Sequence, residues 1–336
     1  MESLHLTGPP PAIRRLAQLA SGIGVTFEVE GGVLRVPFDE SGALIDAAGT
    51  VLAPLEAGLV RAIRTDLSTG SSLSLLTVAC ASPSLANLAA RRKHRRLLQA
   101  IHAREGVTIG YQPVVELASG RVAGFEALLR VRVGTTDITP ADVLSAAEDC
   151  GRLVEVDAVA RSVAIREAAP ALGHRLLFVN LLPASLPVPE EQLAPFVKEV
   201  EELGLDPQSI VLEAPVGPAG TLRRQLESVF DAARGAGFSI GLDNVRSQRD
   251  LDAVDVVPDF VKLDRTMVRS VSSPSGTRAV GAVVRDSAFS EAVVVAQGIE
   301  SADQLHAVRD LGVRFAQGWE LGRPGAIPAE VDAQHA

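Results

Sequence analysis

Cysteine is scarce in this chain of 336 residues, where Cys80 and Cys150 are the only two. Two cysteines so far apart predict neither a disulfide framework nor a thiolate metal site. The chain also has no excess of basic residues. It contains 32 Lys and Arg and 41 Asp and Glu, which gives a net charge of -9. Phosphate backbones are held by basic surfaces, so we expect no nucleic-acid polymer as a partner. The net charge does not exclude a small ligand that carries phosphates, since the charge at one site can differ in sign from the net charge.

Long apolar runs are also absent. No uncharged run approaches the roughly 20 apolar residues that span a bilayer. The start, Met1 to His5, lacks the basic and then apolar regions of a secretory signal. We therefore expect no membrane association and a cytoplasmic location. An apolar content of 47% at this length fits a large α/β barrel with an additional module.

Residues 1–82 predict a small α+β module to which no motif assigns a function. A helical pattern runs from Ile13 to Leu19, and two short β-rich runs around Glu30-Gly31-Gly32 predict a hairpin. A helix near Leu55–Ile63 and a strand near Leu73–Cys80 complete the expected outline.

Residues 83–106 predict one linker helix, from Pro83 to Glu105, with a basic cluster inside it. The cluster consists of Arg91, Arg92, Lys93, Arg95 and Arg96. It could meet an anionic partner or form the solvated face of a helix. We favour the solvated face, because no aromatic residues are interleaved with the basic ones.

Residues 107–328 alternate short β-rich runs with amphipathic helices. The runs are Val107–Val115, Val122–Val131, Leu176–Leu182, Ile210–Ala214, Phe238–Asp243, Phe260–Asp264, Val293–Gln297 and Arg314–Gln317. Several are almost wholly apolar, as parallel strands covered on both faces must be. The pattern predicts a (β/α)8 barrel of the TIM type. The link 116–121 is too short for a crossover helix, so the first strand should pair antiparallel with the second. We expect the tail 329–336 to be disordered.

Polar residues stand at the ends of these predicted strands, where barrels of this type carry their chemistry. They are Glu126, Asn180, Glu213, Asp243, Lys262, Gln297 and Gln317, with Asp264 and Glu300 close behind. Carboxylate and amide oxygens suit Mg, Mn or Ca. The alternative is a metal-free network in which Lys262 and Arg130 balance the acids.

The same residues lie in eight ordered motifs that resemble the EAL domain family of cyclic di-GMP phosphodiesterases and their inactive relatives. The motifs are Tyr111-Gln-Pro113, Phe125-Glu-Ala-Leu-Leu-Arg130, Val179-Asn-Leu181, Val211-Leu-Glu213, Gly241-Leu-Asp243, Val261-Lys-Leu-Asp264, Val295-Ala-Gln-Gly-Ile-Glu300 and Ala316-Gln-Gly318. The resemblance implies a (β/α)8 barrel with an antiparallel first strand.

The resemblance also implies a role for each matching residue. The first-metal ligands, for Mg or Mn, would be Glu126, Asn180, Glu213 and Asp243. Lys262 matches the lysine that orients the catalytic water, and Glu300 and Gln317 match further active-site positions. The residues expected to bind cyclic di-GMP are Gln112, Arg130, Asn180 and Gln317.

The chain departs from the family pattern on one side of this site. Asn244 and Gln297 stand where the family has an aspartate and a glutamate, the latter at the general-base position. Val216 replaces another glutamate, and Val245–Ser247 replaces the loop that this glutamate would anchor. A second metal is therefore doubtful.

These departures predict a degenerate EAL signalling protein, inactive or very weak as an enzyme, that binds cyclic di-GMP. Two alternatives remain. One is an active metal-dependent phosphodiesterase. The other is a nucleotide-independent scaffold that binds a protein partner or a second copy of the chain through the altered segment Asn244–Arg249.

Overall fold

The computed structural model describes residues 2–66, 82–216, 221–252, 254–255, 257–289 and 291–328. The chain divides into two compact units, Met1–Ala103 with Thr139–Leu153 (unit 1) and Arg104–Ile138 with Val154–Ala336 (unit 2). The predicted strand Leu73–Cys80 and the predicted disordered tail lie outside the described residues.

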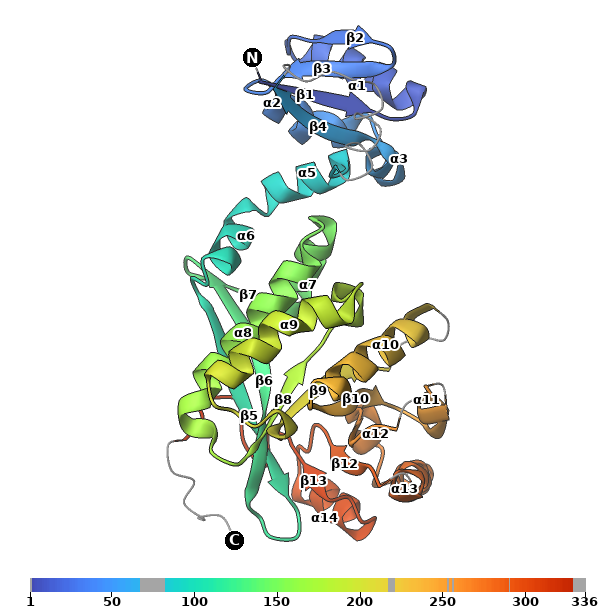
Figure 1. Ribbon diagram of the computed structural model, residues 1–336. Coiled ribbons are helices and arrows are strands. Elements are labelled where there is room, and N and C mark those ends of the chain that lie inside the picture. The colour runs from blue at the N-terminus through green and yellow to red at the C-terminus, as the bar shows by residue number, and fades with distance from the viewer. Residues whose placement is uncertain are drawn as a thin grey trace. The chain divides into compact units, whose positions relative to one another are not determined.

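Unit 1 contains an antiparallel sheet in the order β2-β3-β1-β4 (Figure 1). Its strands are β1 (Glu2–Thr7), β2 (Glu28–Glu30), β3 (Val33–Pro37) and β4 (Arg61–Asp66), and its first helices are α1 (Pro10–Gly22), α2 (Ser41–Ala47) and α3 (Pro54–Leu59). The expected hairpin is present as β2 and β3. The helix expected over Leu55–Ile63 is wrong beyond Leu59, because Val60 is extended and the next residues pair with β1.

The predicted single linker helix is also wrong, because two helices replace it. These are α5 (Leu85–Lys93) and α6 (Arg95–His102), separated at His94, whose φ of -96° and ψ of 16° are not helical. Leu85 is fully buried in the core of unit 1. The first of the two helices thus belongs to the packed module.

Two members of the basic cluster have partners inside unit 1. Arg92 binds Asp46 of α2 through two hydrogen bonds of 2.6 and 2.7 Å. Arg91 Nε donates to the Cys150 carbonyl at 2.8 Å, just past the end of α7 (Pro140–Asp149). Carbonyls at a helix C-terminus lack intrahelical partners and attract cations. The helix α7, expected in the barrel, therefore groups with unit 1 by its contacts.

Unit 2 is a closed barrel of eight strands, as predicted. They are β5 (Val107–Glu116), β6 (Val122–Val133), β8 (Leu176–Asn180), β9 (Ile210–Pro215), β10 (Ser239–Val245), β11 (Phe260–Leu263), β12 (Val293–Ala296) and β13 (Phe315–Ala316). The first strand, β5, runs antiparallel to both β6 and β13, whereas the other neighbours in the ring are parallel. A short strand β7 (Thr136–Ile138) extends β6 as a hairpin.

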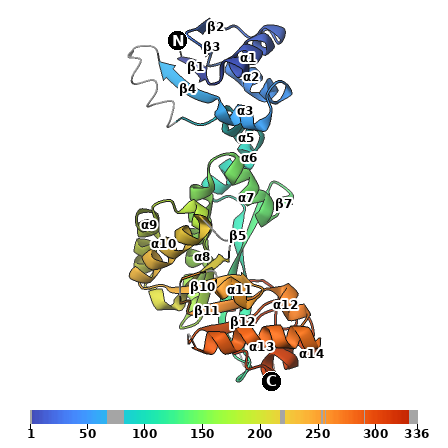
Figure 2. The same ribbon diagram turned by 90° about the vertical axis from the view of Figure 1, so that its right-hand side faces the viewer.

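Helices surround the strands of unit 2 (Figures 1 and 2). They are α8 (Leu153–Leu172), α9 (Pro189–Glu202), α10 (Thr221–Gly235), α11 (Gln248–Asp252), α12 (Arg265–Arg269), α13 (Pro274–Phe289) and α14 (Ala302–Asp310). A layer of apolar side chains from six strands, including Phe178, Phe260 and Phe315, packs together in the core. The Phe178 and Phe260 rings meet edge to face at 5.2 Å.

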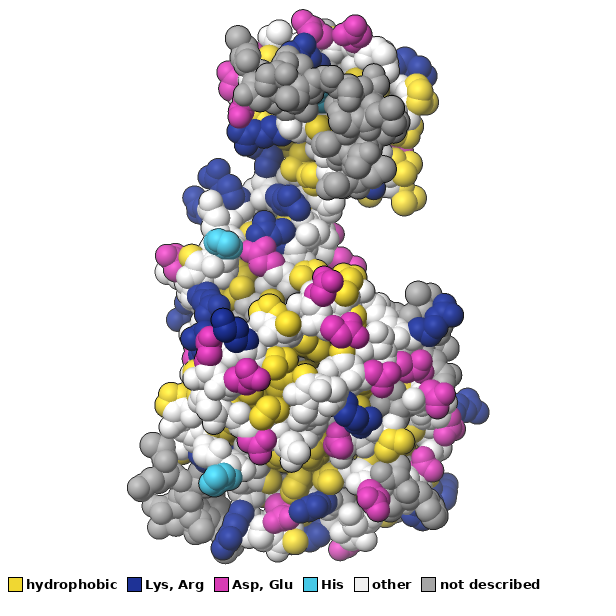
Figure 3. Space-filling model, in the orientation of Figure 1, with side chains coloured by type: hydrophobic (Ala, Val, Ile, Leu, Met, Phe, Trp, Pro, Cys, Tyr) yellow, Lys and Arg dark blue, Asp and Glu magenta, His cyan; other side chains and the backbone are white. Residues whose placement is uncertain are grey.

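The surface of unit 2 mixes both signs of charge. On the face in Figure 3, acidic and basic side chains are interspersed over the helices. None of the helices among the described residues has the length and apolar character needed to cross a membrane.

Leu85 offers a test of whether α5 is part of the folded module. Replacing this fully buried side chain by alanine should destabilise unit 1 by about 2–5 kcal/mol, because the cavity cannot fully close. Hydrogen exchange of β1 and β3 measures the loss. Leu55→Ala, at a side chain that is 85% exposed, is the matched control and should leave exchange unchanged. Equal exchange in the two variants would mean that α5 is only a solvated linker.

Candidate functional site

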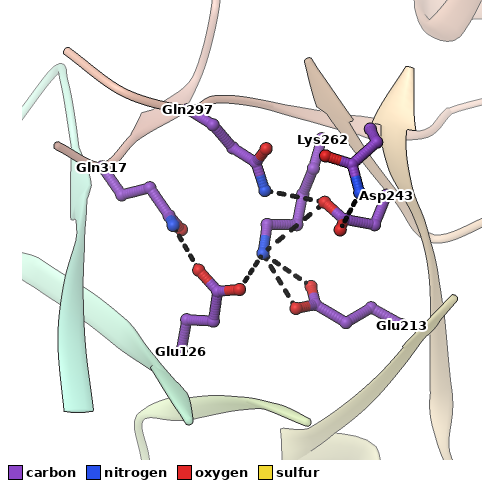
Figure 4. Close-up of polar contacts among 7 residues, drawn as sticks. Glu126, Glu213, Asp243, Lys262, Gln297 and Gln317 are labelled. Carbon is purple, nitrogen blue, oxygen red and sulfur yellow. Dashed lines mark hydrogen bonds and ion pairs between the residues drawn. The ribbon is translucent and has the colours of Figure 1, made fainter. Parts of the chain in front are cut away.

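The ammonium of Lys262, on β11, lies at the centre of the barrel mouth and is fully buried. Its Nζ donates to Glu213 Oε1 at 2.9 Å and lies 2.8 Å from Oε2 of the same carboxylate. The Nζ is 3.1 Å from Glu126 Oε1 and 3.9 Å from Asp243 Oδ1 (Figure 4). A buried charge is tolerated only when it is paired, so three strands contribute acids to hold this one cation.

Three side-chain amides bind the remaining carboxylate oxygens. Gln297 Nε2 donates to Asp243 Oδ1 and Asn244 Nδ2 donates to Asp243 Oδ2, both at 2.7 Å. Gln317 Nε2 donates to Glu126 Oε2. One ammonium and three neutral amides therefore contact the acids, whereas Arg130, the second cation of the metal-free alternative, donates to the Leu129 carbonyl instead.

Burial and the shared ammonium set the ionisation of this cluster. Burial raises the pKa of Glu213 well above its ordinary value, and it also raises the pKa of Asp243. Burial acts in the same direction on Glu126, but Lys262 and Gln317 outweigh it and hold the pKa of Glu126 below its ordinary value. Burial opposes the charge of Lys262, yet the three acids raise the pKa of its ammonium. Of the three acids around this ammonium, Glu126 therefore loses its proton most readily.

A local irregularity of β10 aims the Asn244 amide at Asp243. The register between β10 and β11 shifts between Leu242 and Val245. Asn244 has a φ of 58°, a left-handed conformation that asparagine and aspartate adopt more readily than other side chains. The following loop is held by Asp250, whose Oδ2 accepts from Arg246 N at 2.7 Å and Ser247 N at 3.1 Å.

A cavity of about 890 Å³ opens above the cluster. Of the predicted site residues, its lining includes Gln112, Glu126, Asp243, Gln297, Glu300 and Gln317. The prediction missed five residues that also line it: Arg265, Arg269, Trp319, Glu320 and Arg323. Each of these follows one of the motifs by one to five positions, so the loop after each strand was the available signal.

Some predicted residues do not join the cluster. Asn180 is exposed at the end of β8, where its backbone pairs with Glu213, and it does not line the cavity. Arg130 is exposed and donates to the carbonyl of its neighbour Leu129 at 2.9 Å. Glu300 instead pairs with Arg269 Nη2 at 2.7 Å. Gln112 Nε2 donates to the Gly322 carbonyl at 3.1 Å.

The donor chemistry suits one hard divalent cation better than two. Glu126, Glu213 and Asp243 supply the oxygens that Mg, Mn and Ca prefer. As they stand, no three acidic, histidine or cysteine side chains in the described ranges are arranged to hold a metal ion. The amides of Asn244 and Gln297 carry no charge, so they attract a second cation less than carboxylates would. The charges of these residues therefore favour one cation over two.

Curated relatives resemble part of this chain. An uncharacterised signalling protein of Caulobacter vibrioides is 31% identical over 249 residues, which cover 71% of this chain and 30% of that protein. The probable cyclic di-GMP phosphodiesterase PdeN of Escherichia coli is 27% identical over 247 residues, or 69% of this chain and 46% of that protein. The chain thus spans less than half the length of these relatives.

Solved structures share the barrel. The EAL domain of Xanthomonas citri FimX, in complex with c-diGMP, matches with a TM-score of 0.64 and 21% identity over 72% of this chain and 96% of that chain. The Bacillus subtilis YkuI protein, in complex with substrate c-di-GMP and calcium, matches with a TM-score of 0.60 and 22% identity, over 70% of this chain and 60% of that chain. At such identities the likeness shows the fold.

The raised pKa of Glu213 predicts a pH-dependent difference between the wild type and Glu213→Gln. Folded Glu213 keeps its proton above the ordinary value of 4.5, whereas the unfolded chain loses it. Its contribution to the free energy of unfolding should fall as pH rises above 4.5, by up to about 1.4 kcal/mol per pH unit. Denaturation of both proteins in EDTA at several pH values measures the difference. A difference that is flat or rises with pH would contradict this ionisation.

One family model covers most of the site and its barrel. The EAL domain model matches residues 94–324, which include all eight motifs and every residue of the acid cluster. The order of the strands, the antiparallel β5 and the position of the acids at the mouth agree with that match. The chain therefore belongs to the EAL domain family.

Proposed function

We propose that this chain is a cyclic di-GMP-binding EAL signalling protein that hydrolyses the dinucleotide very slowly or not at all. The observation that carries the proposal is the state of Asp243. Both of its oxygens accept hydrogen bonds from neutral amides, one from Asn244 and one from Gln297.

Hydrolysis of a phosphodiester at neutral pH is the step that these amides impair. The reaction needs a deprotonated water. It also needs cations that neutralise the negative charge on the attacking and the leaving oxygen, and two cations about 3.5–4 Å apart supply this. Amides attract a second cation far less than carboxylates do. Gln297 also has no basic group to take a proton from water, and loss of a general base alone costs about 10²–10⁴ in rate.

Ligand binding is supported by the cavity rather than by the acid cluster. Arg265, Arg269 and Arg323 line it and can neutralise phosphates. The FimX EAL domain and YkuI, which share this fold, were solved with cyclic di-GMP. The ligand-binding roles expected for Gln112 and Gln317 are part of the proposal, since both also line the cavity.

A first cation, Mg or Mn, belongs to the same proposal. The residues that would hold it are Glu126, Glu213 and Asp243, and the fourth predicted ligand, Asn180, would have to join them from its exposed position at the end of β8. When bound, it would add positive charge beside the phosphates. Lys262 contacts the carboxylates of Glu126 and Glu213, and the role expected for it, orienting a water, is part of the proposal. The cytoplasm remains the compartment that we expect for the protein.

An active phosphodiesterase is the second candidate. Its support is the intact cluster of Glu126, Glu213, Asp243 and Lys262 at the barrel mouth. A scaffold that has lost the nucleotide is the third, motivated by Arg246 and Arg249, both exposed beside the altered loop. Measurements of cyclic di-GMP binding and of its hydrolysis distinguish these three functions.

Calorimetry with cyclic di-GMP tests binding. We expect saturable binding to the full chain in EDTA and in Mg or Mn. Gln112→Ala should weaken it, whereas Gln208→Ala, outside the cavity, should not. No heat at high micromolar dinucleotide under either condition would eliminate the binding proposal and favour the scaffold.

Restoring the two acids tests the cause of low turnover. Asn244→Asp with Gln297→Glu should raise hydrolysis on the order of 10²–10⁴-fold, because it returns a general base and a seat for the second cation. Chromatography of the linear product in Mn measures turnover, with Glu126→Ala as the inactive background. Wild-type hydrolysis well above that background and equal to the double variant would show the protein to be an active enzyme.

A further inference from the structure

Trp319 is a large apolar side chain left open to solvent in the cavity. It is the single tryptophan of the chain, and 63% of its surface is exposed. It lines the cavity next to Glu320 and Arg323. The Arg323 guanidinium lies over the indole at 4.8 Å from the ring centroid. The Arg323 guanidinium thus covers one face of the indole ring. The exposed part of the ring is available to stack against a planar ligand.

We infer that Trp319, Glu320 and Arg323 form a platform that recognises a guanine base. The inference rests on the proposed binding of cyclic di-GMP and assigns its base specificity. Aromatic side chains stack nucleobases. A guanine presents two adjacent donors, N1–H and the exocyclic amine, to an acceptor carboxylate such as that of Glu320. Adenine lacks the N1–H donor, so the same carboxylate disfavours it.

The loop that carries the platform is held in place before any ligand arrives. Gly318 lies so close to Ile299 that an added Cβ would meet its carbonyl oxygen at 2.1 Å, so no side chain fits there. Glu320 N donates to the Ile299 carbonyl at 3.1 Å, and Gly322 N donates to the Gly318 carbonyl at 2.9 Å. A fixed platform loses little conformational freedom when a base stacks on it.

Positive charge for the rest of a nucleotide lines the same cavity. Arg265 and Arg269 belong to α12, which starts directly after β11. Arg269 already binds Glu300, so its charge is partly compensated, while Arg265 has no carboxylate within ion-pair distance among the described residues. A nucleotide with its base on Trp319 would share the cavity with these two cations, and acidic side chains such as Glu300 and Glu320 line it as well.

Tryptophan fluorescence tests the platform directly, because Trp319 is the only source of the signal. Stacking of guanine on the indole should quench the emission of the full chain, with the same saturation as calorimetry on the same sample. Cyclic di-AMP serves as the base control and should give little quenching. Unchanged emission together with calorimetric binding would overturn the platform and leave the proposed function standing. No binding by either method would overturn both.

Variants give a second measurement that does not depend on the emission. Trp319→Ala should weaken cyclic di-GMP binding roughly fivefold to 150-fold, the range for removing one stacked base, and Trp319→Phe should weaken it less. Glu320→Gln should cost roughly tenfold or more for cyclic di-GMP but nothing for cyclic di-AMP. Glu201→Gln, an exposed glutamate on α9, is the matched control and should match the wild type. Full affinity in Trp319→Ala, with circular dichroism showing a folded protein, would refute the assignment.

Discussion

The buried contact of the Lys262 ammonium with the carboxylates of Glu126 and Glu213 is the interaction on which the barrel mouth depends. One ammonium cannot balance many acids. Burial and the neighbouring acids raise the pKa of Glu213, and three amides donate hydrogen bonds to the oxygens of Asp243 and Glu126. Were Asn244 and Gln297 carboxylates, five acids would face this single ammonium, and cations would be needed to hold them together. With neutral amides at positions 244 and 297, the cluster needs no second cation to balance its charge.

Helix α5 has defined contacts within unit 1. Arg91 of α5 caps the end of α7, and along the chain α7 lies between β7, the partner of β6, and α8. The basic cluster of α5 and α6, expected to face solvent, therefore includes side chains with defined partners.

The sequence predicted most of the barrel and the acid cluster, because both follow from local patterns. Apolar runs such as Ile210–Ala214 identify parallel strands, and polar residues at their ends, such as Asp243, must meet at one mouth. What the sequence could not show depends on long-range geometry. The left-handed Asn244, the break at His94 and the strand that begins at Arg61 are set by packing against neighbours. Trp319 lay one residue beyond a recognised motif, and only the structure shows it exposed in the cavity.

Because two amides bind Asp243, we expect the protein to leave the dinucleotide intact. A crystal structure of the wild-type protein, grown with cyclic di-GMP and Mn and recorded with anomalous scattering, would show this. We expect an intact cyclic dinucleotide and at most one Mn, with the amides of Asn244 and Gln297 still on Asp243. Two Mn ions at Asp243, or a linear dinucleotide in the cavity, would contradict it.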